Sequence, residues 1–312
     1  MKFIDELDVW LLKDEGRKRT SHYPSDMMSC ARATYWKFMV GDKEHEVKKT
    51  NPPTAGNMVK MKMGNAIESI VDDFLDYLIE TERIASIDKQ MHYRIEIEGL
   101  KYPIGMRLDN GMTMNDGEMI GIEVKSTFGR GVAEIQKKKQ PKPEHLAQIY
   151  PYLEYTPYKK FILPYFGRDN GYRTEFWVKQ AEGGLMVAWP VPNSEDGYGY
   201  AKYELDWSKF IEKFKRIEAA VEAHVLPDRD FMVAIKNGEI KDKFQANKVE
   251  YRSDWNCMYC DWKDHCWADV LPEFADSNNS EDFNIHKEIK EEKDKKELPK
   301  EVDRSKPDLE DA

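Results

Sequence analysis

The sequence predicts an α/β fold, because stretches with a helical period and stretches with strand character alternate along residues 1–275. Two long stretches, residues 57–79 and 206–225, repeat apolar side chains every three or four positions, as amphipathic helices do. Between them lie three consecutive stretches of strand character, at residues 91–98, 102–109 and 118–125.

The N-terminal part adds two shorter helices. Residues 3–14 have an amphipathic pattern, and residues 24–26 (PSD) are a start signal for a helix that runs to about Val40. This second helix carries Cys30 in its first turns. Residues 50–56 (TNPPTAG) form a loop before the first long helix.

The last two of the three predicted strands form an antiparallel pair. Asn110-Gly111 and Asp116-Gly117 bracket the link between them, and both dipeptides are typical of hairpin turns.

The second half of the chain continues the alternation. A helix is expected over residues 143–154 despite Pro151, followed by strands over residues 159–166 and 172–179 with a turn between them. We expect one folded domain over residues 1–275. The charged residues 276–312 are expected to form an acidic, disordered tail that could bind a protein partner.

Net charge does not decide whether the partner is a nucleic acid. The chain carries −10, and residues 273–312 contribute −6 of this, which leaves −4 for the other 272 residues. A local basic groove is compatible with such a mildly acidic domain. No apolar run approaches the roughly 18 residues of a membrane span, and no signal peptide is evident, so a soluble cytoplasmic protein without membrane contact is expected.

Four cysteines stand in a pattern that indicates a metal centre. Cys30 is alone, whereas Cys257, Cys260 and Cys266 follow a C-x2-C-x5-C spacing. In a reducing compartment such cysteines are metal ligands rather than disulfides. An iron–sulfur cluster and zinc both fit four thiolates, and His265 could replace one cysteine in a zinc site. Either centre would close a loop of more than 200 residues and stabilise its ends.

A second constellation consists of carboxylates and a lysine. Alternation along a strand puts Glu123 and Lys125 on one face, and antiparallel pairing could add Asp109 to the same surface. Two carboxylates suit Mg²⁺ or Mn²⁺, and a lysine beside them could stabilise charge on a phosphodiester. Glu68 could supply a third carboxylate from the long helix. A Glu-x-Lys pair alone is also a common surface arrangement on exposed strands.

The helix after the strands offers further candidates. Gln148 and Tyr152 lie on one face of it and could hold a DNA backbone or position the lysine, although a packed tyrosine with a surface amide fits equally well. The run 137–139 (KKK) could contact phosphates or be a solvated loop. Four aromatic residues near the last cysteines could stack on bases, but shielding of the metal centre is favoured: Trp255, Tyr259, Trp262 and Trp267.

With these residues in this order along the sequence, the chain resembles the PD-(D/E)XK nuclease superfamily. The resemblance is to its RecB-like branch, which has a four-cysteine iron–sulfur cluster. CRISPR-associated adaptation exonucleases and AddB nuclease domains are of this type. The motifs that carry the resemblance span residues 29–266: Ser29-Cys30-Ala31-Arg32, Tyr35-Trp36, Gly64-Asn65-Ala66-Ile67-Glu68, Asp109, Glu123-Val124-Lys125, Gln148-x3-Tyr152 and Cys257-x2-Cys260-x5-Cys266.

The resemblance implies a restriction-endonuclease-like mixed central sheet flanked by helices. It implies that Mg²⁺ or Mn²⁺ is bound by four groups: Glu68, Asp109, Glu123 and the carbonyl of Val124. Lys125 would be the catalytic lysine, with Gln148 and Tyr152 as the RecB-type Q-x3-Y motif. The four cysteines would ligate a [4Fe-4S] cluster with a structural role.

Two positions depart from the family pattern. Glu68 stands where the family often has a histidine, and Asp109 follows Leu108 instead of glycine. The implied function is metal-dependent DNA hydrolysis, as an exonuclease on single strands or DNA ends. The alternative is a non-enzymatic nucleic-acid-binding or adaptor module with a structural metal centre.

Overall fold

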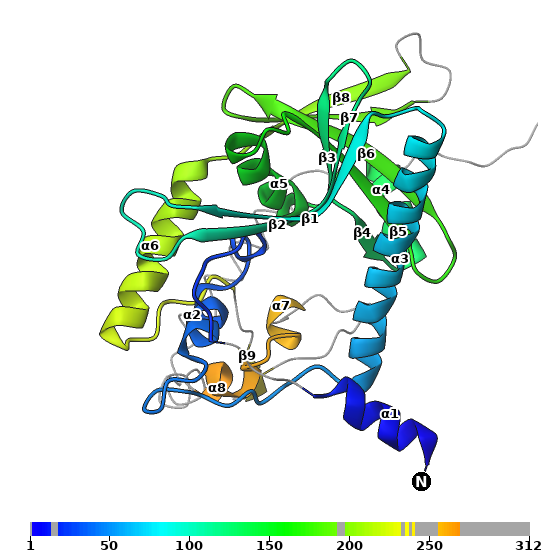
Figure 1. Cartoon of the computed structure of the whole chain (residues 1–312). Coiled ribbons are helices and arrows are strands. Elements are labelled where there is room, and N and C mark those ends of the chain that lie inside the picture. The colour runs from blue at the N-terminus through cyan, green and yellow to red at the C-terminus, as the bar shows by residue number, and fades with distance from the viewer. Residues whose placement is uncertain are drawn as a thin grey trace, which may run out of the picture.

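The computed structural model describes residues 2–13, 18–191, 197–231, 235–236, 239–240 and 255–268. A mixed eight-stranded sheet forms the centre of this part of the chain, in the order β1-β2-β3-β5-β6-β7-β8, with β4 beside β5. Helices flank the sheet, with α3 and α6 at opposite flanks of the molecule (Figure 1). The predicted α/β class is therefore confirmed. The tail at 276–312 and the predicted domain end at 275 lie outside the described residues.

The strands of the central sheet are β1 Ser86–Ile95, β2 Ile104–Thr113, β3 Met119–Ile122, β4 Lys125–Thr127, β5 Lys160–Gly167, β6 Arg173–Ala181, β7 Gly184–Pro190 and β8 Tyr198–Glu204. A separate pair consists of β9 Ile235–Lys236 and β10 Glu239–Ile240. The helices are α1 Phe3–Leu11, the 3-10 turn η1 Pro24–Asp26, α2 Ala31–Met39, α3 Ala55–Glu80, α4 Gly129–Lys138, α5 Pro143–Tyr155, α6 Trp207–Ala223, α7 Trp255–Met258 and α8 Lys263–Ala268.

The sheet changes direction at its centre. The pairs β1–β2 and β2–β3 are antiparallel, whereas β3 and β4 are both parallel to β5. Strands β5 to β8 form an antiparallel meander. A parallel connection needs a crossover, and α4 and α5 provide it between β4 and β5. The catalytic candidates lie at this change of direction, where β3 gives way to β4.

The two faces of the sheet bury different cores. One core joins strand residues such as Ile104 and Leu108 to Leu146 of α5 and Phe214 of α6. The other joins Val71 and Leu75 of α3 to three apolar side chains of β3 and the segment after it: Ile120, Ile122 and Val124. The buried face of α3 contains fewer residues than the apolar pattern of its sequence, because Ile70 and Phe74 are more than half exposed.

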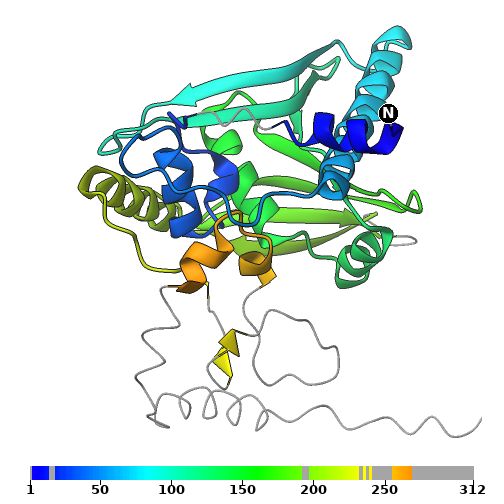
Figure 2. The ribbon, with the colours of Figure 1, turned by 90° about the horizontal axis from the view of Figure 1, so that it is seen from below.

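A third core joins the two ends of the described chain. Tyr35, Trp36 and Met39 of α2 pack with Trp262, Cys266 and Trp267 from the segment of α7 and α8. Figure 2 shows the two orange C-terminal helices beside α2. Segments more than 200 residues apart in sequence thus form one unit.

Several predicted elements differ in extent. Asn110-Gly111 is not a turn but lies inside β2, and the turn that follows centres on Gly117. Gly111 is needed for close packing, since a Cβ there would meet the Tyr158 hydroxyl at 2.2 Å. The helix predicted from residue 24 is split: η1 ends at Asp26, and Cys30 is the extended N-cap residue of α2.

The sequence did not predict α4, β7 and β8, nor the short elements β9, β10, α7 and α8. The lysine run 137–139 therefore ends a helix, with Lys139 as its left-handed C-cap, and is not an open loop. The antiparallel pairing of β2 with β3, the helix through Pro151 and the long α6 are confirmed. Within the described residues, no helix combines the length and apolar character needed to span a membrane.

Candidate functional site

Three predicted side chains meet where β3 ends and β4 begins. Glu123 follows β3, is 2% exposed, and accepts hydrogen bonds through its Oε1 from Lys125 Nζ (2.8 Å) and Gln148 Nε2 (2.6 Å). Lys125 Nζ also donates to Gln148 Oε1 at 2.9 Å. The side-chain amide of Gln148 on α5 and the amino group of Lys125 on β4 thus both bind the buried carboxylate of Glu123. Gln148 therefore contacts Lys125, which is the arrangement that one of its expected roles, positioning the lysine, requires.

Asp109 comes to the same place from β2. Its neighbour Asn110 pairs with Ile122 at the end of the antiparallel ladder, which brings Asp109 beside the segment that follows β3. Asp109 is 5% exposed, and its Oδ2 accepts a hydrogen bond from the Val124 amide at 2.9 Å. The expected convergence of the two carboxylates is therefore present.

In the described part of the chain, one buried carboxylate oxygen of the site lacks a hydrogen-bond partner. Among the described residues, no group hydrogen-bonds to Glu123 Oε2. Burial raises the pKa of Glu123 to about 7, although Lys125 opposes the rise, and burial also raises the pKa of Asp109. A buried, unpaired acceptor is costly unless an ion or proton satisfies it. This donor set of hard oxygens fits a divalent cation such as Mg²⁺ or Mn²⁺.

Helix α3 brings further carboxylates to the site. Glu68 is half-buried, and burial followed by the charge of Asp109 raises its pKa, while Arg107 and Lys125 lower it. The helix can approach because Gly64 faces Ser126 of β4, where an added Cβ would lie 3.2 Å from the serine hydroxyl.

Asp72 is a further carboxylate of the site, which the sequence alone did not single out. It lies one helical turn beyond Glu68, accepts a hydrogen bond from Asn110 Nδ2 at 2.8 Å, and raises the pKa of Asp109. Its i, i+4 spacing from Glu68 was the available signal.

Tyr152 does not reach a surface that DNA could contact. Its side chain is 1% exposed, and its hydroxyl donates to the Arg107 carbonyl at 2.8 Å. The expectation of a backbone-holding tyrosine is therefore wrong for this residue, because α5 packs it against β2. It braces the strand two residues before Asp109, and burial raises its pKa.

His145 is a second residue of the site that the sequence alone did not single out. It precedes Gln148 by three positions on α5, and its Nδ1 lies 2.8 Å from the Tyr165 hydroxyl. Burial, followed by the charge of Lys125, lowers its pKa to about 2. The ring is therefore neutral and adds no positive charge beside Lys125. Its i, i+3 spacing from Gln148 was the available signal.

The four cysteines line one cavity of about 690 Å³. Cys30 opens α2, and the C-terminal cysteines come from the segment of α7 and α8. Arg229 Nε lies 3.2 Å from Cys266 Sγ, so a cation stands beside the thiols. Burial raises the pKa of Cys260 to about 11, and the nearby Cys30 and Cys266 raise it further. Clustered thiols of this kind become thiolates when a metal compensates their charge.

The surroundings of the cavity separate shielding from ligation. Trp262 and Trp267 are at most 8% exposed and belong to the local core, which fits the favoured shielding role. Tyr259 is 70% exposed, and the side chain of Trp255 lies outside the described residues. His265 is exposed, its Nε2 lies 3.1 Å from the Lys48 carbonyl, and it does not line the cavity.

The raised pKa of Glu123 predicts a metal-dependent pH profile of stability. Without divalent metal, the free energy of unfolding falls by about 3 kcal/mol as pH rises from 4.5 to about 7, because the folded carboxyl holds its proton longer than the unfolded one. In Glu123→Gln the fall is smaller, and the remainder comes from Asp109 and Glu68. Urea unfolding in EDTA at stepped pH measures both.

The matched control is Glu98→Gln, an exposed carboxyl between β1 and β2. It leaves the pH profile as in the wild type. Added Mg²⁺ or Mn²⁺ removes most of the decline in the wild type, because the cation stabilises the ionised carboxylates. A profile that stays flat in EDTA contradicts the buried position of Glu123.

Comparisons with known proteins give a limited likeness. A scan against protein-family models finds no matching family. A search of curated proteins finds no match. Among solved structures, the crystal structure of SSO0001 is similar at 15% identity, covering 84% of this chain and 93% of that chain, with a TM-score of 0.42.

Two structures of one enzyme are also similar. The alkaline exonuclease LHK-Exo from Laribacter hongkongensis matches at 16% identity, 70% of this chain, 93% of that chain and a TM-score of 0.37. The same exonuclease in complex with dAMP matches at 15% identity with equal coverage and a TM-score of 0.33. At these TM-scores the function has to rest on the residues of the site.

Proposed function

We propose that the protein is a metal-dependent DNA nuclease that hydrolyses phosphodiesters with Mg²⁺ or Mn²⁺. One observation carries the proposal: the buried Glu123, close to Asp109, is held by Lys125 and Gln148, and one of its carboxylate oxygens has no hydrogen-bond partner among the described residues. The order of motifs along the chain supports the same PD-(D/E)XK type of chemistry.

The site divides the chemistry between two groups of residues. The divalent cation would be held by Asp109, Glu123, Glu68 and the Val124 carbonyl. When bound, it would lower the pKa of a water molecule and withdraw charge from the phosphate. Lys125 carries a positive charge next to these groups and stabilises the charge that develops on the phosphate oxygens. Gln148 fixes the lysine amino group so that it needs no reorganisation during the reaction.

A cationic aromatic element adjoins the site and supports DNA as the substrate. Phe128 follows β4 directly and is 50% exposed. Lys60 Nζ lies 5.8 Å from its ring centre and the Arg168 guanidinium carbon 5.4 Å. Arg168 also donates to the Lys60 carbonyl at 2.8 Å, which fixes the group. Aromatic and guanidinium planes stack on unpaired bases, and the two cations attract phosphates.

This element predicts a measurable share of single-strand binding. Phe128→Ala weakens binding of a fluorescent single-stranded oligonucleotide by about tenfold, the scale of one lost base stack. The measurement uses the Lys125→Ala background, so that cleavage does not interfere. Lys60→Ala also lowers the salt dependence of binding by about one charge.

The matched control is Tyr200→Ala, because Tyr200 is 59% exposed but stands on the edge strand β8. It leaves oligonucleotide affinity unchanged. Equal losses in Phe128→Ala and Tyr200→Ala contradict a specific element at β4.

We further propose a [4Fe-4S] cluster as the structural centre at the four cysteines, with zinc as the alternative. A cavity lined by all four thiols has room for a cluster, and Arg229 offsets part of its negative charge. Among the described residues, no three of these cysteines have sulfur atoms that all lie within 4.8 Å of one another. Four thiolates around one zinc ion would lie about 3.8 Å apart, given Zn–S bonds of about 2.3 Å.

The decisive experiment is a cleavage assay with end-labelled single-stranded, double-stranded and circular DNA. We expect degradation with Mg²⁺ or Mn²⁺, none with EDTA, and release of short products from free ends if the enzyme is an exonuclease. DNA binding without cleavage under any of these metals overturns the proposal and favours a nucleic-acid-binding or adaptor module.

A further inference from the structure

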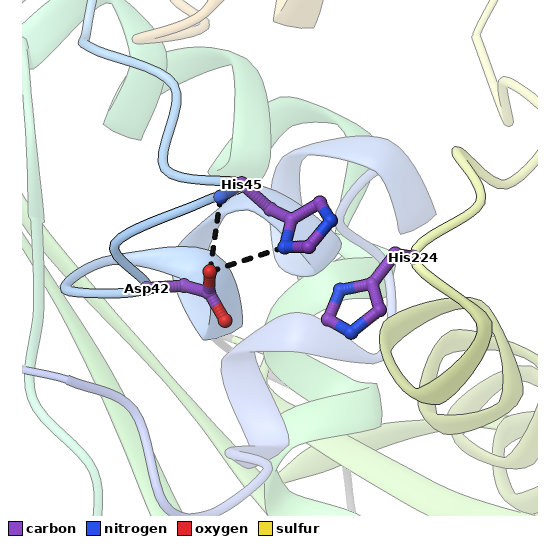
Figure 3. Close-up of side chains that lie close together, drawn as sticks. All are labelled: Asp42, His45 and His224. Carbon is purple, nitrogen blue, oxygen red and sulfur yellow. Dashed lines mark hydrogen bonds and ion pairs between the residues drawn. The ribbon is translucent and has the colours of Figure 1, made fainter.

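A cluster of two histidines and an aspartate lies away from both sites described above. Asp42 and His45 belong to the loop after α2, and His224 caps the C-terminus of α6. Figure 3 shows the two imidazole rings and the carboxylate turned toward one another from these two segments. One donor atom from each of the three side chains lies within 4.8 Å of the other two.

The local structure already holds the carboxylate in place. Asp42 Oδ1 accepts hydrogen bonds from the His45 amide at 2.9 Å and the Glu44 amide at 3.0 Å, and it lies 3.2 Å from His45 Nδ1. The backbone N–H groups of His45 and Glu44 lower the pKa of Asp42, so it is a carboxylate at neutral pH. It therefore presents a charged oxygen ligand without further ordering.

Helix capping alone does not account for the histidine at 224. Its φ of 53° is left-handed, and glycine is the usual residue at such a helix end. The imidazole instead stacks on that of His45, with ring centres 3.8 Å apart and an angle of 14°. Because the rings are parallel, ligation by both requires one of them to turn. The exposed side chain of His224 has the freedom to do so.

We propose that Asp42, His45 and His224 form a binding site for a transition-metal ion, with Zn²⁺ as the occupant. Two imidazoles and one carboxylate are a donor set typical of zinc, with water in the fourth position. This set differs from the hard oxygens of the carboxylate site and from the four thiols. The assignment does not depend on nuclease activity.

The place of the site suggests a structural role. The segment after α6 carries Arg229, which contacts Cys266, and Asp230, whose Oδ2 accepts a hydrogen bond from the Ala31 amide at 2.7 Å. A metal that ties His224 to the loop after α2 therefore fixes the start of a segment that contacts both Cys266 and the first residue of α2. Zinc at this position stabilises the cysteine unit from a second side.

The test is calorimetric titration of the full-length protein, purified anaerobically with its cysteine centre loaded, with Zn²⁺ in excess Mg²⁺. We expect one binding event that weakens by at least about tenfold in His45→Ala and in His224→Ala. The matched control, His92→Ala, removes an exposed histidine of β1 and keeps the event unchanged. Asp42→Asn preserves the shape of the side chain, and it weakens binding even if an alanine variant folds poorly.

A second readout identifies the ligands directly. Cu²⁺ in the same site shows couplings to two imidazole nitrogens in the electron paramagnetic resonance spectrum of the wild type, and to one in each alanine variant. Unchanged zinc affinity in both alanine variants overturns the proposal. Equal weakening in His92→Ala means an adventitious ion only and overturns it as well.

Discussion

Lys125→Ala lowers metal-dependent DNA cleavage by about 10²- to 10³-fold, the cost of removing one preorganised charge from a transition state. The amino group lies 2.8 Å from Glu123 and 2.9 Å from Gln148, so it is held in place before substrate arrives. Its loss leaves the fold and the cysteine centre intact, because the side chain is 17% exposed and bonds only within the site among the described residues. Initial rates on end-labelled DNA at saturating Mn²⁺ measure the effect.

The pH profile separates a catalytic role from a structural one. Lys125 lowers the pKa of Glu123, so the variant needs a higher pH before this carboxyl ionises and accepts the metal. The residual activity of Lys125→Ala therefore rises toward higher pH relative to the wild type.

A lysine elsewhere in the sheet provides the control. Lys160 of β5 is paired with Glu118 at 2.5 Å on the surface, and Lys160→Ala leaves cleavage within about twofold of the wild type, as expected for a surface ion pair. Full activity in Lys125→Ala, measured beside this control, contradicts the proposed nuclease mechanism.

Cys30→Ser removes the metal centre and destabilises the protein by about 4 kcal/mol, the scale of a covalent link that closes a very long loop. Cys30 is more than 200 residues from its expected partners, and α2 packs on their segment through Tyr35, Trp36 and Met39. We expect loss of iron, of acid-labile sulfide and of visible absorption, together with a lower urea midpoint.

Ser29→Ala is the matched control, because Ser29 neighbours Cys30 and its hydroxyl bonds only the Ser25 carbonyl among described partners, at 2.9 Å. It keeps the iron content of the wild type. Zinc without visible absorption in the anaerobic wild type contradicts the cluster and supports the zinc alternative. Unchanged metal content and stability in Cys30→Ser contradict a four-cysteine centre.

Local periodicity was sufficient to predict that Glu123 and Lys125 of the candidate site lie together. Glu123 and Lys125 are two positions apart in an extended segment, and this spacing alone puts their side chains on one side of the chain. Asp109 needed one more condition, the antiparallel register of β2 with β3, which the turn before β3 made predictable. These inferences depend on short-range geometry, which the sequence encodes directly.

Other features depended on packing between distant segments. Asn110-Gly111 has the sequence of a turn, yet Tyr158 lies over Gly111 and β2 continues through it. Tyr152 and Gln148 share a helix face by spacing, but the fit of α5 against the sheet buries the tyrosine and leaves the amide at Lys125. Such contacts depend on which surfaces meet, and one chain segment carries no signal for that.

The sequence by itself determined the α/β class, the paired carboxylates with their lysine, and the spacing of the four cysteines. The tertiary structure decided that Glu123 is buried with one oxygen that no described residue hydrogen-bonds, that all four cysteines line one cavity, and that Asp42 and His45 meet His224. The physical reason is the range of the interactions. Strand alternation and helical periodicity depend on residues that are close in sequence. Burial and the contacts between these side chains arise only when distant segments pack together, in some cases segments more than 200 residues apart.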